Sequence, residues 1–347
     1  MKALGITKLL DIGELKTALT RLEVPVPAPG PAEIQVKIHA ACINIDDIHM
    51  AEGTFLGGVL PVKASTKKPK VCGVDAAGIV EKIGDKVTAF KPGDAVFGYC
   101  PPKGPGTWAE YTCIPQHQAL KKPADYTFEA AAACAIGGKT AANAVMSAGN
   151  VSGKSCMVIG ASGGIGAIIL QILKKCGAHV TGVCSGRNHE LVLSLGADTV
   201  IDYTQGSLAD QAEGKAFDRV IDCIGGKDTE KQALKVLKRN GRFVTLCGPD
   251  KYIGDTRSGT WGMIKMMTYV SWRAFASLAR GPRYIMAGIS STPEPVKDYI
   301  LAHAIKPPID RVLSFDENSV REGVAYVASH RARGKVVISV IPADTPA

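Results

Sequence analysis

The sequence predicts an α/β protein with two domains, a β domain followed by a doubly wound parallel sheet. Residues 156–173 show a buried-strand pattern, a glycine turn and an apolar helix pattern in succession, and further apolar strands then alternate with helical segments. Residues 1–124 consist instead of short strands separated by prolines. Since 347 residues exceed the usual size of one hydrophobic core, we expect one domain for each pattern.

The β domain is predicted over residues 1–124, with strand patterns at residues 34–40, 78–84, 94–99 and 109–111. Prolines interrupt this region, ten of them between residues 25 and 105. Because proline cannot donate a hydrogen bond within a sheet, it favours edges and loops over long central strands. We therefore expect a compact barrel.

The sheet domain is predicted over residues 125–290. An alanine-rich stretch, residues 128–146, predicts one unbroken helix that joins the two domains, and strand patterns follow at residues 157–159, 179–184, 199–201, 219–221, 242–246 and 284–289. Residues 250–282 are rich in Met, Trp, Tyr and Arg, which predicts a helical flap over a pocket or a subunit contact, with plain core packing equally favoured.

Residues 291–347 are expected to return to the first domain. Helix patterns at residues 294–304 and 318–331 precede a final strand pattern at residues 335–340. An edge strand at 284–289 would expose apolar surface unless it is covered, so we expect a homodimer that pairs this strand with its copy.

Glycines at a three-residue spacing, Gly160-x-x-Gly163-x-x-Gly166, separate the first strand of the sheet domain from its helix. Such a turn lets backbone approach a diphosphate, and the helix start offers free N–H groups and the positive end of its dipole. The spacing alone is a weak signal, because close helix packing also uses glycine. The alternating strands around it favour a dinucleotide.

The turn after the second strand of the sheet domain predicts which dinucleotide binds. NAD-selective folds place an acidic residue there to accept hydrogen bonds from the ribose, but residues 161–189 contain none. Ser185, Arg187 and Asn188 offer a hydroxyl, a guanidinium and an amide, and Tyr203 after the third strand adds a phenol. This set predicts NADPH, bound through its 2′-phosphate, with a solvated Arg187 as the alternative.

The composition indicates which class of ligand the protein binds and in which cellular compartment it lies. The net charge of +9 is spread along the chain, with its densest cluster at residues 67–70, so we expect an anionic small ligand and no nucleic acid. Ten cysteines without a C-x-x-C pair indicate a reducing compartment. No membrane span and no targeting leader are visible, so a cytoplasmic protein is expected, or a mitochondrial one if a leader has been removed.

Several short stretches together resemble the zinc-free quinone oxidoreductase branch of the medium-chain dehydrogenase/reductase superfamily. They are Asn44-x-x-Asp47, the segments 73–78, 91–96, 106–111, 160–166 and 195–198, and Arg333-Gly334-Lys335. Within this branch, residues 183–185 and 200–203 and the Met/Trp-rich insertion are similar to the reticulon-interacting mitochondrial oxidoreductases. The resemblance implies a GroES-like β-barrel domain and a Rossmann dinucleotide-binding domain.

The resemblance also implies that the protein has no zinc site. The positions aligned with the Cys, His and Cys ligands of the zinc alcohol dehydrogenases hold Asn44, Val74 and Ile136, and none of these is a strong zinc ligand. Nearby Cys72 and Cys134 are expected to be packing residues.

Roles for individual residues also follow from the resemblance. Asn44 would lie on a turn and donate a hydrogen bond to a carbonyl oxygen, Asp47 would act beside it or only brace the loop, and His49 would donate a proton or be structural. The predicted cofactor contacts are Thr140 at the nicotinamide carboxamide, Gly163, Gly164 and Ile165 at the diphosphate, Cys247, and Lys335 as an added cation.

The expected activity is the NADPH-dependent reduction of a small electron acceptor, a quinone or an α,β-unsaturated carbonyl. Without a Lewis acid, reduction of an electron-poor acceptor is easier than oxidation of an alcohol. An enoyl-thioester reductase is the second hypothesis, because the tyrosine that such enzymes use is matched here by Phe55. An NADPH-binding scaffold protein is the third.

Overall fold

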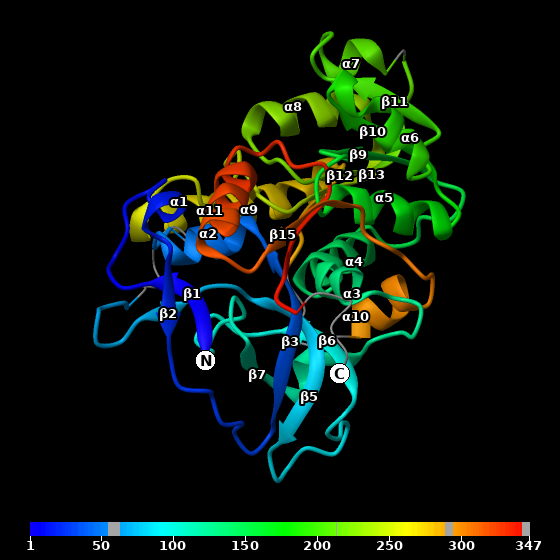
Figure 1. Ribbon diagram of the computed structural model, residues 1–347. Helices are drawn as coiled ribbons and strands as arrows, with labels where there is room; N and C mark the ends of the chain where they lie inside the picture. Colours follow the sequence, from blue (N-terminus) through cyan, green and yellow to red (C-terminus); the bar gives the residue numbers. More distant parts are fainter. Residues whose placement is uncertain (55–62, 213, 289–293, 342–347) are drawn as a thin grey trace. The chain divides into compact units, whose positions relative to one another are not determined.

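The predicted fold class is confirmed: the chain joins a β domain to a domain built on a parallel sheet (Figure 1). The computed structural model describes residues 1–54, 63–212, 214–288 and 294–341. Two compact units result. Unit 1 takes its described residues from Met1–Ile136, Ser291–Glu294 and Ile309–Ala347, and unit 2 from Gly137–Ser290 and Pro295–Pro308.

Unit 1 contains two sheets. One has the order β2-β1-β4, and the other has the order β15-β16-β3-β5-β6-β8 with β7 also paired to β3. The strands are β1 (Lys2–Ile6), β2 (Thr20–Glu23), β3 (Glu33–Ile43), β4 (Lys70–Val71), β5 (Asp75–Ile83), β6 (Ala95–Tyr99), β7 (Tyr111–Pro115), β8 (Ala119–Lys121), β15 (Ile309–Ser314) and β16 (Lys335–Ser339). Its helices are α1 (Leu15–Ala18), α2 (Ile45–Ala51), α3 (Phe128–Ala133) and α11 (Glu317–Ala328), with a 3-10 turn at Gln116–Gln118.

Strand β3 is the centre of unit 1. It is the longest strand there, and it pairs antiparallel with β5, β7 and β16. Val336 of β16 lies opposite Ile43, and Ala76 of β5 lies opposite Ala41. The carboxyl end of β3 is therefore flanked by the first residues of two neighbouring strands.

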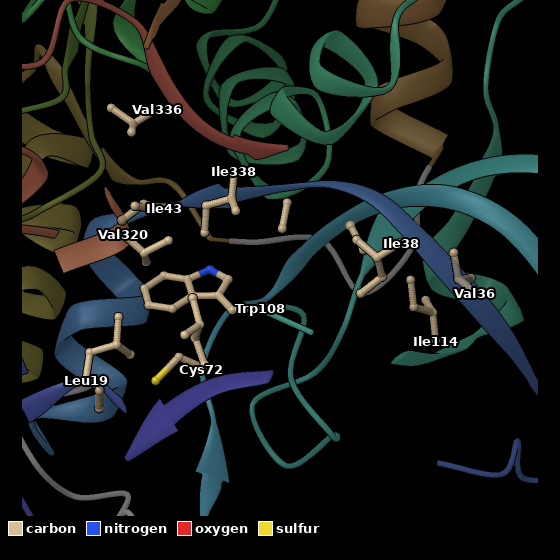
Figure 2. Close-up of a cluster of buried hydrophobic side chains, with 14 of the residues drawn as sticks. Leu19, Val36, Ile38, Ile43, Cys72, Trp108, Ile114, Val320, Val336 and Ile338 are labelled. Carbon is tan, nitrogen blue, oxygen red and sulfur yellow. The ribbon is translucent and has the colours of Figure 1, made fainter. Parts of the chain in front are cut away.

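The core of unit 1 packs around Trp108, which is completely buried (Figure 2). Its indole nitrogen donates to the carbonyl oxygen of Cys42 at 2.9 Å, so this buried polar atom is satisfied. Gly73 gives the ring its space, because a Cβ there would lie 2.3 Å from Trp108 Cδ1. Gly73, the first residue of the segment 73–78 that resembles the family, is therefore required by the packing of Trp108.

Unit 2 is built on six parallel strands in the order β11-β10-β9-β12-β13-β14. The strands are β9 (Ser155–Ile159), β10 (His179–Cys184), β11 (Thr199–Asp202), β12 (Phe217–Asp222), β13 (Leu237–Thr245) and β14 (Arg283–Met286). The helices are α4 (Ile136–Ala148), α5 (Gly166–Lys175), α6 (His189–Ser194), α7 (Leu208–Gln211), α8 (Lys227–Val236), α9 (Gly259–Arg280) and α10 (Glu294–Val296), with a 3-10 turn at Gly186–Asn188 and a π-turn at Lys297–Leu301. The sheet reverses its winding between β9 and β12, which is where open α/β sheets bind ligands.

The alanine-rich stretch forms two helices, so the prediction of one unbroken helix was wrong. Helix α3 ends at Ala133 and α4 begins at Ile136. At the break, the N–H of Ile136 donates to Asp75 Oδ1 at 2.8 Å, a contact that a continuous helix would not allow. A tertiary hydrogen bond therefore overrides the helix propensity of alanine.

Other boundaries differ by smaller amounts. Strand β14 covers Arg283–Met286 in place of 284–289, and residue 289 lies outside the described residues. The predicted strand at 109–111 is only an isolated bridge at Ala109, with β7 beginning at Tyr111. The segment predicted to be a helix at 294–304 contains only the short turns of α10 and Lys297–Leu301.

The Met/Trp-rich segment 250–282 is mostly one helix, α9, held against α8 by a buried ion pair. Arg273 donates to Glu230 at 2.6 Å, and Tyr269 donates to the same carboxylate at 3.0 Å. The outer face of the helix carries apolar side chains that unit 2 leaves exposed. They are Trp261, Ile264, Met267, Trp272, Phe275 and Leu278.

Candidate active site

A buried polar cluster lies at the carboxyl end of β3 in unit 1, built by the strand register described above. Asn44 follows β3 directly, Lys335 begins β16 and Asp75 begins β5. Asp75 and Lys335 are 0 % and 5 % exposed. Buried charged groups require ion-pair or hydrogen-bond partners, and the residues of this cluster provide them for one another.

Asn44 lies at the centre of the cluster, and its neighbours fix the orientation of its amide. Its Oδ1 accepts from the Lys335 ammonium, and its Nδ2 donates to Asp47 Oδ2 at 3.1 Å and to Asp75 Oδ2 at 3.0 Å. Since an ammonium only donates and a carboxylate only accepts, the opposite orientation is excluded. Both amide hydrogens of Asn44 are thus committed within the protein.

Asn44 and Asp47 lie at the start of a helix, where the sequence had predicted a turn. Asn44 is the N-cap of α2, and its backbone N–H donates to Asp47 Oδ2 at 2.7 Å. The signal for this helix was present in the sequence, because an Asx residue followed three positions later by an acidic one is typical of a helix start. The structure therefore brings Asn44, Asp47 and Lys335 into one network.

Burial raises the pKa of each carboxyl in this network. Desolvation is the main cause for Asp46, Asp47 and Asp75, and the neighbouring Asp75 charge raises the pKa of Asp47 further. Among the described residues, the Oδ1 atom of Asp47 is buried without a hydrogen-bond partner. For Lys335, burial opposes the charge, yet the surrounding acidic groups, including Asp75 and Asp47, hold its pKa above the ordinary value. The ammonium is therefore the positive charge around which this network is arranged.

His49 and the two nearby cysteines are also buried. His49 lies in the last turn of α2 and is 4 % exposed. Burial raises the pKa of the Cys72 and Cys134 thiols to about 12, so both stay protonated at neutral pH. Within the described residues, no three His, Cys, Asp or Glu side chains form a group that could hold a metal ion.

The glycine turn of unit 2 has the shape that a diphosphate requires. Gly160 has a φ of +81°, and a Cβ on Gly166 would lie 2.1 Å from the Gly160 carbonyl oxygen, so both positions require glycine. A Cβ on Gly163 would meet no atom closer than 3.4 Å, which leaves this backbone open to a ligand. Gly163, Gly164 and Ile165 directly precede α5. The turn fits the phosphates of a dinucleotide.

Three residues that were predicted to bind the 2′-phosphate follow β10, and their side chains differ in solvent exposure. Arg187 is exposed, and Ser185 is half-buried. Asn188 is 5 % exposed, and its Nδ2 donates to Ser162 Oγ at 2.9 Å and to Ser185 Oγ at 3.4 Å. Asn188 therefore ties the glycine turn to the next turn, while Arg187 remains free to meet an anion.

Asp202 is a neighbour of this turn that sequence reasoning missed. It ends β11 opposite Cys184, and a Cβ on Gly186 would lie 2.6 Å from Asp202 Oδ2. Hydrogen bonds from Thr204, with a smaller contribution from Gly186, lower the pKa of Asp202, so it is an anion at neutral pH. The sequence prediction considered only residues 161–189, which contain no acidic residue. The Asp202 carboxylate was missed because it belongs to the adjacent strand β11.

The remaining predicted cofactor residues also belong to unit 2. Tyr203 is 60 % exposed beside the turn after β10, and Cys247 follows β13. Between them Asp222, completely buried at the end of β12, accepts from the N–H groups of Ile224 and Gly225 and from Thr245 Oγ1. Thr140 lies in α4. Tyr203, Cys247 and the two turns thus follow carboxyl ends of strands in one parallel sheet, which meet at one edge.

Comparison with known proteins shows which families the two parts of this chain resemble. Residues 30–124 match the alcohol dehydrogenase GroES-like domain, and residues 195–338 match the zinc-binding dehydrogenase model. The mouse mitochondrial NAD(P)H oxidoreductase RTN4IP1 is 35 % identical, over 89 % of this chain and 82 % of its own. The chain belongs to the medium-chain dehydrogenase/reductase superfamily. It is therefore an oxidoreductase of a nicotinamide-dependent superfamily.

Two further known proteins are similar along most of the chain. The 2-methylene-furan-3-one reductase of tomato, Solanum lycopersicum, is 31 % identical over 99 % of this chain and 80 % of its own. The quinone oxidoreductase structure from Coxiella burnetii superposes with a TM-score of 0.79 at 24 % identity, covering 98 % of this chain and 99 % of that one. Among the described residues no helix has the length and apolarity needed to cross a membrane.

Proposed function

We propose that this oxidoreductase transfers a hydride from NADPH to a quinone or to the β-carbon of an α,β-unsaturated carbonyl, and that it does so without zinc. The observation that carries the proposal is the chemistry of the three positions aligned with zinc ligands. Asn44, Val74 and Ile136 stand there, and a lysine ammonium lies against Asn44. Zinc favours Cys, His and carboxylate ligands, and a neighbouring ammonium would repel it.

The names of the relatives agree with this class of reaction. The mouse relative is named an NAD(P)H oxidoreductase and the tomato relative a 2-methylene-furan-3-one reductase. A protein of Arabidopsis thaliana named NADPH-dependent alkenal/one oxidoreductase is 29 % identical over 89 % of this chain. Quinones and enones share an electron-poor carbon conjugated to a carbonyl oxygen.

The chain has residues to hold NADPH, which when bound supplies the hydride of its nicotinamide C4 and leaves as NADP⁺. Gly163, Gly164 and Ile165 would bind the diphosphate, and Thr140 the carboxamide. Ser185, Arg187 and Tyr203 would bind the 2′-phosphate, with Asn188 fixing their turn and Cys247 lining the site. The described residues do not pair the Arg187 guanidinium, and such a group is well suited to a phosphate.

Reduction is the favoured direction of the reaction. Oxidation of an alcohol requires a group that stabilises an alkoxide, a task for which zinc-dependent members use the metal. Reduction of an activated carbonyl requires only a positioned hydride and a hydrogen bond to the oxygen on which charge develops. The residues of unit 1 offer such a donor without a metal.

A panel of acceptors tests the proposal. The loss of NADPH absorbance is followed with a benzoquinone, an alkenal, an alkenone and an enoyl-thioester, and a Gly163→Asp variant, which adds a carboxylate to the phosphate turn, is the control. Turnover of quinones or enones by the wild type alone supports the proposal. Preference for the thioester would favour an enoyl-thioester reductase, although Phe55 lies outside the described residues. NADPH binding without turnover of any acceptor would indicate a scaffold protein.

We also propose that the protein is a homodimer. Strand β14 is an unpaired edge of the parallel sheet, and the neighbouring α9 exposes Trp272 and Phe275, which are 59 % and 77 % accessible. Edges and apolar patches of this size are usually covered. Light scattering should give twice the chain mass, and Trp272→Glu with Phe275→Glu should give a monomer, whereas Leu193→Glu on exposed α6 should not. A wild-type monomer would refute the dimer.

For the compartment, we propose a reducing one, the cytoplasm or the mitochondrion. All ten cysteines are free and most are buried. Cell fractionation with an antibody to the native protein distinguishes the two.

A further inference from the structure

The buried ammonium of Lys335 has a chemical setting that a structural ion pair would not require. One of its N–H groups donates to Asn44 Oδ1, and Asp75 Oδ2 lies 3.7 Å from Nζ, a distance that gives charge attraction without a direct hydrogen bond. Within the described part of the chain, no further acceptor lies within hydrogen-bond distance of Nζ. An ammonium has three hydrogens, so it retains donor capacity for an added oxygen atom.

The carboxylates around the ammonium also accept hydrogen bonds from other donors. Asp75 accepts from the N–H of Ile136 through one oxygen and from Asn44 through the other. Asp47 accepts both the backbone N–H and the side-chain amide of Asn44. These bonds hold the negative charge away from full contact with Lys335, and they hold Asn44 so that its oxygen points at the ammonium.

The same bonds leave Asn44 without a free donor. Both of its amide hydrogens point to carboxylates, so donating to a substrate oxygen would break a buried hydrogen bond to a charged group. Lys335 faces no such cost. Of the two groups, the lysine is better placed to serve as the donor.

We propose that the Lys335 ammonium stabilises the oxyanion that forms on the acceptor. The inference rests on the proposed reductase function. As the hydride bonds to the β-carbon of an enone, the C=C π pair forms a new bond between the α-carbon and the carbonyl carbon, and the C=O π pair moves onto the oxygen. A Lys335 N–H donates to that oxygen. A proton from water then completes the reduction. Asn44 and Asp75 are positioning residues, because they act through the lysine.

The positions of the three residues give this inference its geometric basis. The family resemblance implies that Asn44 and Ile136 match two zinc-ligand positions, and Asp75 directly follows the third, Val74. Asp75 bonds to Asn44 through one carboxylate oxygen and to Ile136 through the other, which places all three around one carboxyl group. The only side-chain cation paired with this carboxyl among the described residues is Lys335.

Steady-state kinetics of Lys335→Met test the proposal. Loss of an oxyanion donor should lower kcat for an enone roughly 10²- to 10³-fold, while the Kd of NADPH stays unchanged. A rise in that Kd matching the loss of activity would instead make Lys335 the cofactor contact that the sequence predicted. Lys174→Met is the matched control, because Lys174 pairs with Asp198 at 2.7 Å at an exposed site of unit 2, and it should retain wild-type kcat.

A double variant separates chemistry from charge neutralisation. Lys335→Met alone leaves the Asp75 carboxylate buried without its cation, so the Tm should fall. Lys335→Met with Asp75→Asn removes both charges and should recover Tm while kcat remains low. Recovery of kcat to near the wild-type value would show that the lysine only neutralises Asp75, and would overturn the proposal.

Phenolate binding gives a readout that does not depend on turnover. With NADP⁺ present, a nitrophenolate mimics the enolate, and Lys335→Met should weaken its binding roughly ten- to hundredfold, while binding of an uncharged nitrobenzene changes little. If wild type reduces no acceptor but binds phenolate through Lys335, the proposed function fails and the oxyanion site stands. If wild type is active and neither kcat nor phenolate binding responds to Lys335→Met, only the lysine proposal fails.

Discussion

Each unit of the protein contains one completely buried aspartate near its candidate site, and the two differ in what surrounds them. Asp222 in unit 2 accepts backbone N–H groups of Ile224 and Gly225 and the hydroxyl of Thr245. Asp75 in unit 1 accepts one backbone N–H and one amide, and it pairs with the Lys335 ammonium. Burial raises the pKa of both carboxyls.

The difference indicates two uses of the same buried group. Asp222 shapes a loop at the end of a strand, so its hydrogen bonds end within the protein fold. Asp75 holds a cation that retains a hydrogen for another molecule. We infer that unit 1 supplies the electrostatic chemistry and unit 2 supplies cofactor binding, so substitutions in the two units should alter different kinetic constants.

The largest effect is expected from removing the two aspartates in turn. Asp75→Ala frees Lys335 and Asn44 from their position, so kcat should fall about a hundredfold, as for loss of an oxyanion donor. Asp222→Ala leaves the buried N–H groups of Ile224 and Gly225 and the Thr245 hydroxyl without their acceptor. The free energy of unfolding should therefore fall by about 1–3 kcal/mol, while kcat at saturating NADPH is retained. Urea unfolding and steady-state kinetics measure both quantities.

The Asp→Asn variants at both positions repeat the test with less risk to folding, because asparagine retains one acceptor oxygen. A similar loss of kcat from both substitutions would remove the distinction between the two units.

A smaller effect is expected at the exposed turn of unit 2. Arg187→Ala removes a guanidinium that the described residues do not pair, so the Kd of NADPH should rise about ten- to hundredfold, as for loss of a charge-assisted hydrogen bond. The Kd of NADH, which lacks the phosphate, should not change. Fluorescence titration with each cofactor gives both constants, and equal losses, or a wild type that prefers NADH, would refute phosphate recognition by this turn.

The smallest effect is expected from Asp202, whose carboxylate lies against Gly186 in the same turn. A negative charge there opposes the 2′-phosphate, but the group is only half-buried and is screened by solvent. Asp202→Asn should therefore tighten NADPH binding only roughly two- to fivefold and leave NADH unchanged. The same titrations apply, with measurements at low and high salt. Weaker NADPH binding in this variant would mean that Asp202 supports the turn more than it repels the phosphate.

The parallel sheet was predictable from the sequence because its signals are local. Each strand of unit 2 is a short apolar run, Gly160 is required by its own φ of +81°, and Gly166 is required by the nearby carbonyl oxygen of Gly160. The order of strands then follows from the general rules for doubly wound sheets. Even there, the carboxylate of Asp202 was missed, since it reaches Gly186 across a strand pair.

The polar cluster of unit 1 could be predicted only in part. Asn44 and Asp47 are three residues apart and were found together, but the partners of Asn44 and Asp47 include groups far along the chain. Asp75 appeared as the start of a strand, and Lys335 as a cation directed at the cofactor. Only the register of β3 with β5 and β16 shows that they meet. Side-chain hydrogen bonds between distant segments leave no periodic pattern in a sequence.

The central claim, that a protein cation does the work of a metal, is tested most directly by the metal content of active enzyme. Protein purified without added metal and dialysed against a strong chelator is analysed for zinc, and NADPH oxidation with an enone is measured on the same sample. The account predicts less than stoichiometric zinc with full kcat after chelation. One tightly bound zinc per chain, whose removal abolishes turnover and whose return restores it, would contradict the account.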